Sequence, residues 1–348
     1  MPLADLAEQV WYGESTGARV VRRVLSPLSA LYGGMITRIN DRYDHAVPAS
    51  GSIPAMSIGN LTVGGTGKTP VSAWFASRLT AAGARPAIVL RGYGDDEVLV
   101  HRLLNPGLSV VADAQRVRGV EQAARDGADV AILDDAFQHR RAARVADVVL
   151  LSADRWTGAP RLLPSGPFRE PIGSLRRASL ILVTVKAAGD RQVGLTVDAA
   201  RSVAASAVVT VDLLPAAFVN VASHEVRNLD AWHGARVLAV SGIGDPASFS
   251  VQLARLGLQP AARAFPDHHA FSADDVSSIA HEAVGFDAVI CTLKDAVKLG
   301  PAWPGSACPL WYLSQSVVPR DGADEMDAVI QSVLQARRNG PTSPDLSR

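Results

Sequence analysis

Short apolar runs alternate along the chain with longer segments of helical periodicity. Several runs are continuous Val, Ile and Leu, which is typical of parallel strands buried on both faces. The predicted strands are Ile53–Ile58, Pro86–Leu90, Val130–Leu133, Val145–Leu151, Leu180–Val185, Val208–Leu214, Arg236–Val240, Ala288–Thr292 and Leu310–Leu313. The predicted helices are Pro70–Ala82, Ala114–Asp126, Ala247–Leu256, Ser272–Ala283 and Ala323–Ala336. This alternation predicts an α/β fold with mostly parallel, helix-covered sheets.

The same pattern favours two α/β/α domains over one. Residues 1–204 contain a glycine-rich loop between a strand and a helix, so a P-loop NTPase-like domain is expected there. A second strand–glycine–helix unit begins at Val237, which predicts a smaller Rossmann-like domain over residues 221–338. Residues 205–220 are expected to connect the two domains. The polar tail 339–348 contains two prolines and is expected to be disordered.

The segment Arg19–Asn40 mixes aliphatic residues with arginines in a helical pattern. A helix with an apolar face and an arginine-rich flank can lie in a membrane interface. Amphipathic helices also pack on the domains of soluble proteins, so the pattern alone leaves both interpretations open.

The amino-acid composition argues against a nucleic-acid-binding function. Formal net charge is zero, from 34 basic and 34 acidic residues, and aromatic residues make up only 5%. A nucleic-acid binder usually has a basic excess and stacking aromatics, so no nucleic-acid partner is expected. The two cysteines, Cys291 and Cys308, do not form a zinc-ligand pattern and are expected to be reduced.

The N-terminus lacks the basic and apolar regions of a signal peptide. No uninterrupted apolar run approaches the length that spans a bilayer. A cytoplasmic protein is therefore expected.

The strongest chemical signal is the segment Gly59–Pro70, GNLTVGGTGKTP. It follows an apolar strand and precedes a helix, which is the context of a phosphate-binding loop. Glycines let backbone N–H groups surround phosphate oxygens, and the helix N-terminus favours the same anion. Thr62 replaces the first glycine of the strict motif, and the neighbouring glycines supply the flexibility. The predicted nucleotide-binding residues are Gly64, Gly65, Thr66, Gly67, Lys68 and Thr69, with Lys68 at the β/γ-phosphates and the Thr69 hydroxyl on magnesium.

A second cluster follows the strand Val130–Leu133, which ends in Asp134 and Asp135. The carboxyl ends of parallel strands face the ligand site in open α/β sheets. Both aspartates are therefore predicted to bind magnesium, directly or through water.

Six ordered segments carry a family resemblance: Ser57–Pro70, Leu133–Arg140, Leu162–Pro171, Ser241–Asp245, Phe265–His268 and Thr292–Lys298. In them the chain resembles the tetraacyldisaccharide 4′-kinase family, which phosphorylates a lipid A precursor. Residues 25–41 also resemble the membrane-associating N-terminal segment of that family.

The resemblance implies transfer of the ATP γ-phosphate to the 4′-hydroxyl of a tetraacyl glucosamine disaccharide 1-phosphate, forming lipid IVA. ATP and Mg²⁺ would be the cofactors. It implies two α/β/α domains joined by a two-stranded linker, with the active site in the cleft. The protein would be peripheral on the inner face of the inner membrane, held there through its N-terminal helix.

The resemblance also assigns residues. Gln138, Arg169 and Glu170 would line the substrate site. Asp95 and His268 would form an acid–histidine dyad that activates the sugar hydroxyl, a poor nucleophile until a base accepts its proton. Asp96 is an adjacent alternative to Asp95, because the usual spacer before the family's Gly-Asp-Glu motif is missing here.

Two further positions depart from the family pattern: Leu293 replaces a glutamate of a Thr-Glu-Lys-Asp motif, and Ala136 replaces a glycine. The competing hypothesis is a P-loop GTPase or ATPase of the metallochaperone or partitioning type. The chain has neither the Asn-Lys-x-Asp guanine motif nor a Cys/His metal cluster, which disfavours that class. A third hypothesis, a non-catalytic membrane-surface protein, is disfavoured by the intact Lys68, Thr69, Asp134 and Asp135.

Overall fold

A computed structural model describes residues 3–92, 95–243, 246–266 and 269–340. The chain divides into two compact units. Unit 1 contains residues 1–93, 104–213 and 317–348, and unit 2 contains residues 94–103 and 214–316. The mostly parallel α/β fold class that the sequence predicts is confirmed.

The sheet of unit 1 has the strand order β7-β6-β5-β1-β4-β2-β3, with neighbouring strands parallel. The strands are β1 (Ala55–Asn60), β2 (Pro86–Leu90), β3 (Ser109–Ala112), β4 (Val130–Asp134), β5 (Ala146–Ser152), β6 (Leu180–Val185) and the first half of β7 (Ala207–Asn220). Every residue of β1, β2, β4 and β6 is buried, as continuous apolar runs require. Because β1 is central, its carboxyl end lies beside those of β4 and β5.

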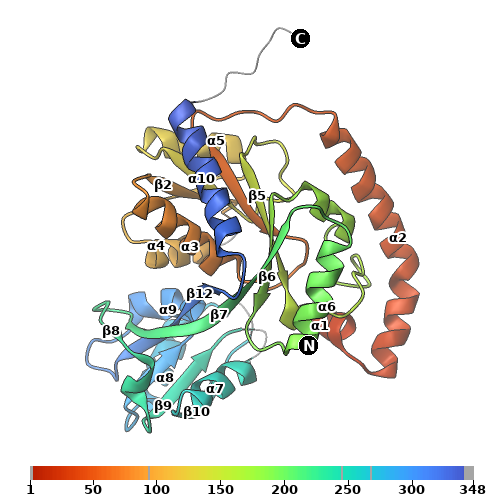
Figure 1. Ribbon diagram of the computed structural model, residues 1–348. Helices are drawn as coiled ribbons and strands as arrows, with labels where there is room; N and C mark the ends of the chain where they lie inside the picture. Colours follow the sequence, from red (N-terminus) through yellow and green to blue (C-terminus); the bar gives the residue numbers. More distant parts are fainter. Residues whose placement is uncertain (1–2, 93–94, 244–245, 267–268, 341–348) are drawn as a thin grey trace. The chain divides into compact units, whose positions relative to one another are not determined.

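Helices pack on the apolar sides of this sheet (Figure 1). They are α3 (Lys68–Ala81), α5 (Arg116–Arg125), α6 (Asp190–Arg201) and α10 (Ala323–Asn339), with short 3₁₀ turns at Ala153–Arg155 and Ile172–Arg177. Val120 and Ala123 of α5 pack with Ala87 and Val89 of β2. The sequence placed α10 in the second domain. It packs on α3, β5 and β6 of unit 1 instead, because β12 carries the chain back there.

Two helices precede the sheet: α1 (Leu3–Tyr12) and the 29-residue α2 (Thr16–Asp44), which runs along one side of unit 1 (Figure 1). The Ser15 side chain caps α2 by accepting the Ala18 N–H. Arg22 ties the two helices together by donating to the carbonyls of Val10 and Gly13. No helix in the described part of the chain is long and apolar enough to cross a membrane.

Unit 2 is a smaller three-layer arrangement, with strand order β10-β9-β11-β12 in parallel. Its strands are β9 (Arg236–Ser241), β10 (Gln259–Ala264), β11 (Ala288–Cys291) and the first part of β12 (Leu310–Pro319). Its helices are α4 (Asp95–Leu104), α7 (Pro246–Arg255), α8 (Ala273–Glu282) and α9 (Leu293–Leu299), with 3₁₀ turns at Leu229–Trp232 and Gly300–Ala302. Alternate residues of β9 pack on α7 and on α8, so helices cover both faces.

Two long strands, β7 and β12, are neighbours, and each carries residues of both units. The short β8 (Val226–Arg227) pairs antiparallel with β7. Residues 205–220, the expected connection, thus consist mainly of β7. Cys291 and Cys308 are free thiols.

Candidate active site

The glycine-rich loop joins the end of β1 to the start of α3 in unit 1. Gly67 has φ +87° at the N-terminus of α3, and a Cβ there would lie 2.3 Å from Leu213 Cδ1. Gly64 has φ +109°, also in the left-handed region. Glycine is needed at both positions because a side chain would strain the turn. A Cβ on Gly65 would meet open space, so Gly65 leaves room for a ligand to approach the backbone.

Buried side chains hold the loop in shape. Asn60 ends β1 and donates from Nδ2 to Thr66 Oγ1 at 2.8 Å. Thr184 of β6 donates to the Thr66 carbonyl at 2.9 Å. Asn60, Thr66 and Thr184 are all buried. The Thr66 hydroxyl, predicted among the nucleotide-binding groups, is therefore engaged by the protein, and its backbone N–H donates to the Gly64 carbonyl at 3.1 Å.

Lys68 and Thr69 are the first residues of α3, and the first turn of this helix contains no acidic side chain. The unpaired N–H groups at a helix N-terminus carry partial positive charge and attract anions. The start of α3 can therefore attract an anion such as a phosphate.

The paired aspartates lie at the carboxyl end of β4. Asp134 is buried, and its Oδ1 accepts from the Ser72 hydroxyl of α3 at 2.8 Å. Asp135 has φ +47°, an uncommon conformation for a residue with a side chain. This turn directs the carboxylate of Asp135 toward Lys68, whose Nζ lies 3.7 Å from Oδ1.

Arg169 completes this charge cluster, pairing with Asp135 Oδ1 at 2.8 Å and Oδ2 at 3.2 Å. Burial alone would raise the pKa of the Asp135 carboxyl, but Lys68, Arg169 and Arg116 together hold it below its ordinary value. Asp135 therefore stays ionised at neutral pH.

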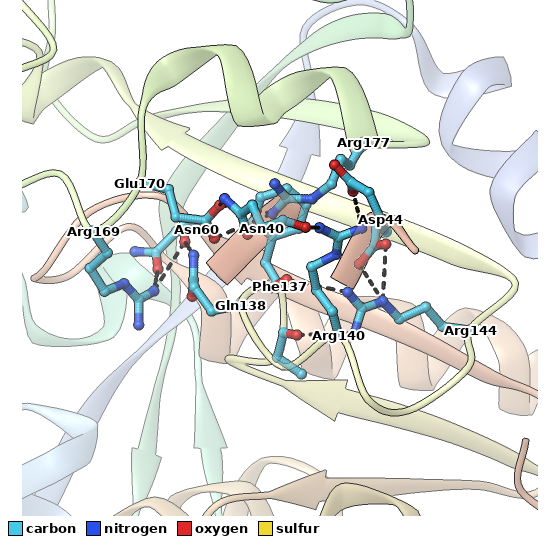
Figure 2. Close-up of polar contacts among 12 residues, drawn as sticks. Asn40, Asp44, Asn60, Phe137, Gln138, Arg140, Arg144, Arg169, Glu170 and Arg177 are labelled. Atoms are coloured by element: carbon cyan, nitrogen blue, oxygen red, sulfur yellow. Dashed lines mark hydrogen bonds and ion pairs between the residues drawn. The ribbon is translucent and has the colours of Figure 1, made fainter. Parts of the chain in front are cut away.

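Arg169 and Gln138 meet at Asn60 (Figure 2). The Asn60 carbonyl accepts from Gln138 Nε2 at 2.9 Å and from Arg169 at 3.0 Å, and Arg169 also donates to the Asn60 side chain. The Gln138 Oε1 atom is buried and has no hydrogen-bond partner among the described residues. A buried polar atom without a partner is costly, so this oxygen is suited to accept from a ligand or water.

Glu170 occupies a different environment from its neighbour. Its carboxylate is buried and accepts from Arg177 at 3.0 Å and from Asn40 of α2 at 2.9 Å (Figure 2). Arg177 in turn stacks over the Phe137 ring. Both oxygens of Glu170 thus accept hydrogen bonds from protein groups, whereas the family resemblance implies that this residue lines the substrate site.

The predicted dyad belongs to unit 2. Asp95 begins α4, but its side chain lies outside the described residues, as does His268. Their sequence neighbours are described. Asp96 forms an ion pair with Lys298 of α9 at 2.7 Å, and Lys298 also donates to the His269 carbonyl at 3.2 Å. Asp96, the alternative base, therefore already has a cationic partner.

The sequence missed several residues that shape these clusters, above all Asn60, Thr184, Arg116 and Lys298. Asn60 is a polar residue at the end of an apolar strand, a signal that could have been noticed. Arg116 is buried and donates to the carbonyls of Asp113 and Asp134. Burial, followed by Arg116 and nearby arginines, lowers the pKa of His139, so that histidine is neutral at pH 7.

The donor set around α3 fits magnesium bound with phosphate. No group of three or more His, Cys, Asp or Glu side chains gathers as a metal site in the described ranges. Mg²⁺ in phosphoryl-transfer sites uses one or two carboxylates, waters and substrate phosphates, so a protein cage is not required. The Thr69 hydroxyl and the carboxylates of Asp134 and Asp135 supply such a set.

A parallel α/β sheet, a glycine loop at a helix N-terminus and carboxylates at the next strand end define a P-loop nucleotide-binding protein. The family model for tetraacyldisaccharide-1-P 4′-kinase matches residues 21–106 and 93–335. The chain belongs to this family, which confirms the predicted resemblance.

Individual relatives match most of the chain. The tetraacyldisaccharide 4′-kinase of Anaeromyxobacter dehalogenans strain 2CP-C is 36% identical, covering 86% of this chain and 88% of that protein. That of Halorhodospira halophila is 35% identical, covering 90% and 93%. A crystal structure of LpxK from Aquifex aeolicus in complex with ATP is similar with a TM-score of 0.72 and 26% identity, covering 90% of this chain and 99% of that one. The GTPase or metallochaperone alternative is not favoured.

Proposed function

We propose that this protein transfers the γ-phosphate of ATP to the 4′-hydroxyl of a tetraacyldisaccharide 1-phosphate, forming lipid IVA. The observation that carries the proposal is the family match over nearly the full chain, together with an intact phosphate loop and strand-end aspartates. The relatives are named as kinases of this substrate, and the Aquifex relative binds ATP.

The site residues of unit 1 would each have a role in this reaction. The N–H groups of Gly64, Gly65 and Gly67 and the start of α3 would hold the β- and γ-phosphates, with Lys68 neutralising charge that develops on the transferred group. Thr69, Asp134 and Asp135 would hold Mg²⁺, which draws charge away from the phosphate oxygens when bound. Arg169 and Gln138 would orient the acceptor.

Proton removal from the sugar hydroxyl is assigned to Asp95, supported by His268, on the family resemblance. The ion pair between Asp96 and Lys298 supports this choice over Asp96. The Asp96 carboxylate is already held 2.7 Å from the Lys298 ammonium group.

The second part of the proposal is that α2 lies on the membrane surface where the glycolipid is found. Its large exposed apolar residues are Val20, Val21, Val24, Leu28, Leu31, Met35 and Ile39. At about 100° per residue these seven positions fall within an arc of about 100°, forming one stripe. Exposed arginines on the same helix, Arg19, Arg23, Arg38 and Arg42, would contact anionic lipid headgroups.

This surface supports a peripheral location at the cytoplasmic face of the inner membrane. Leu31 is 72% exposed and Val24 70%, which is costly in water for a contiguous stripe. The test is sedimentation with vesicles containing anionic lipid. Leu31→Asp with Met35→Asp is expected to reduce the bound fraction several-fold, whereas Ser26→Asp, which adds charge off the stripe, should change it little. Equal binding of the three proteins would remove the membrane proposal.

The transfer reaction is tested with ATP labelled on its γ-phosphate and tetraacyldisaccharide 1-phosphate in mixed micelles. Label is expected in the glycolipid, in a reaction that requires Mg²⁺. Acceptor that already carries a 4′-phosphate serves as the blocked control and should take up no label. ATP hydrolysis without labelled glycolipid would contradict the proposal and favour an ATPase.

A further inference from the structure

The segment Leu162–Glu170 links α2 to the candidate active site. On one side it contacts α2 at three positions along the helix. Ser29 is buried and bonds with the Ser165 hydroxyl at 2.7 Å and the Leu162 carbonyl at 3.0 Å. Tyr32 donates to the Arg169 carbonyl at 2.9 Å, and Asn40 donates to Glu170 at 2.9 Å.

The other side of the same segment contacts the phosphate loop. Val63 N–H donates to the Pro167 carbonyl at 2.8 Å, and Arg169 N–H donates to the Leu61 carbonyl at 2.7 Å. The Arg169 side chain continues to Asp135, which faces Lys68. A displacement of the segment would therefore move both the loop backbone and the Arg169–Asp135 pair.

The inward face of α2 is opposite the apolar stripe. Counting about 100° per residue, Ser29 lies about 130° and Asn40 about 150° from the centre of the stripe. Gly33 lies on the same inward face, and a Cβ there would come within 2.8 Å of Leu162 Cδ1. One face of the helix thus carries exposed apolar side chains, and the other is bonded to the segment that carries Arg169.

Losing the hydrogen bonds between α2 and this segment is expected to be costly, because one of them reaches a buried charge. Glu170 is a buried carboxylate with two kinds of donor, Arg177 and Asn40 (Figure 2). Removing one donor from a buried charge costs more than removing a neutral surface bond. Arg140 also contacts the same turn of α2: it donates to the Asn40 carbonyl at 3.0 Å and forms an ion pair with Asp44.

We propose that Tyr32 and Asn40 are positioning residues for phosphoryl transfer: they hold Arg169 and Glu170 so that Arg169 keeps Asp135 and Lys68 in place beside the phosphate loop. The inference deepens the proposed function and rests on it. Its consequence is that the helix proposed to lie on the membrane also orders the nucleotide site, so the seating of α2 alters the rate of transfer.

Asn40→Ala and Tyr32→Phe test this, because each removes one donor and little volume. Each is expected to lower kcat about tenfold, with the KM for the glycolipid changed less than twofold and vesicle binding unchanged. Thr37→Ala is the matched control, since within the described part of the chain the Thr37 hydroxyl bonds only to the Gly33 carbonyl of its own helix. Asn40→Gln keeps an amide donor and should recover part of the lost rate.

A double variant identifies the route of the effect. If Asn40 acts through the segment that carries Arg169, then Asn40→Ala should cost much less in an Arg169→Ala background than in the wild type. Additive losses, or an Asn40→Ala protein with normal kcat, would overturn the inference. A loss of rate explained by a lower unfolding temperature and not recovered by Asn40→Gln would also overturn it.

These outcomes differ from failure of the proposed function itself. If the wild-type protein transfers no phosphate to the glycolipid, the proposed function fails, and MgATP binding becomes the readout. Weaker MgATP binding by Asn40→Ala than by Thr37→Ala would then still support positioning of the nucleotide site, whereas equal binding would overturn it.

Discussion

Two lysines at helix ends, one in each unit, have similar burial but different surroundings. Lys68 begins α3, is 18% exposed, and lies 3.7 Å from the carboxylate of Asp135. Lys298 is in the last turn of α9, is 11% exposed, and lies 2.7 Å from Asp96 while also bonding the His269 carbonyl. Lys68 is near its carboxylate without a close bond, whereas Lys298 is fully engaged by protein groups.

This difference means that Lys68 is available to a ligand, whereas Lys298 supports the fold. A loosely paired ammonium at a helix N-terminus can turn to phosphate oxygens at little cost. A buried ammonium with short bonds to two segments keeps those segments together. Both residues belong to motifs, so residue type and motif alone do not distinguish the two roles.

The largest effect is expected from Lys68→Ala, which removes the cation proposed to face the β- and γ-phosphates. We expect kcat to fall by about a thousandfold because charge on the transferred phosphoryl group loses its nearest compensation. Steady-state phosphate transfer measures it, and Lys294→Ala, an exposed lysine of α9, is the control. A loss below tenfold would mean that Lys68 is not the phosphate-binding cation.

The second prediction compares neighbouring aspartates. Asp95→Asn is expected to lower kcat by about 10²–10⁴-fold with MgATP binding retained, because the proposed general base is lost. Asp96→Asn keeps a side chain beside Lys298 and should cost less than about tenfold. Turnover and MgATP binding are measured on both variants. The reverse order of effects would make Asp96 the base.

Lys298→Met is expected to have a moderate effect of a different kind. It keeps the apolar stem but leaves Asp96 and the His269 carbonyl without their partner. We expect the unfolding temperature to fall by about 2–4 °C and kcat to fall severalfold, with MgATP affinity unchanged. Lys298→Arg should restore most of the stability. A loss of MgATP affinity as large as that of Lys68→Ala would erase the distinction between the two lysines.

Strands could be predicted from the sequence where they are buried on both faces. The bounds predicted for Pro86–Leu90 and Leu180–Val185 agree with β2 and β6, because an uninterrupted apolar run has few other stable environments. The edge strands β3 and β10 were missed. Most residues of β10 are exposed or half-buried, so its sequence carries no apolar run. The helix α4 was also missed, since it directly follows glycine-rich residues.

In the candidate site, too, some features could be predicted from the sequence and others could not. Lys68, Thr69, Asp134 and Asp135 could be found because each lies at a fixed step from a strand or glycine motif. The contacts of Thr184 and Glu170 could not, because their partners are distant in sequence: Thr66 lies 118 residues from Thr184, and Asn40 lies 130 residues from Glu170. Local patterns identify a residue type at a strand end, but only the tertiary fold selects its hydrogen-bond partner.

The smallest effect concerns Asp275, which closes the capping box of α8 with Ser272 and bonds His269 at 3.0 Å. The bonds from the Ser272 N–H and hydroxyl, followed by that from His269, lower the pKa of Asp275 to about 2. A carboxyl with a depressed pKa stabilises the fold above its ordinary pKa, and that contribution is lost as the pH falls toward 2. The unfolding temperature of Asp275→Asn should therefore lie about 2–4 °C below wild type at pH 7 and approach it near pH 2–3. A difference that stays constant over this range would show that the charge of Asp275 does not hold His269 and the start of α8.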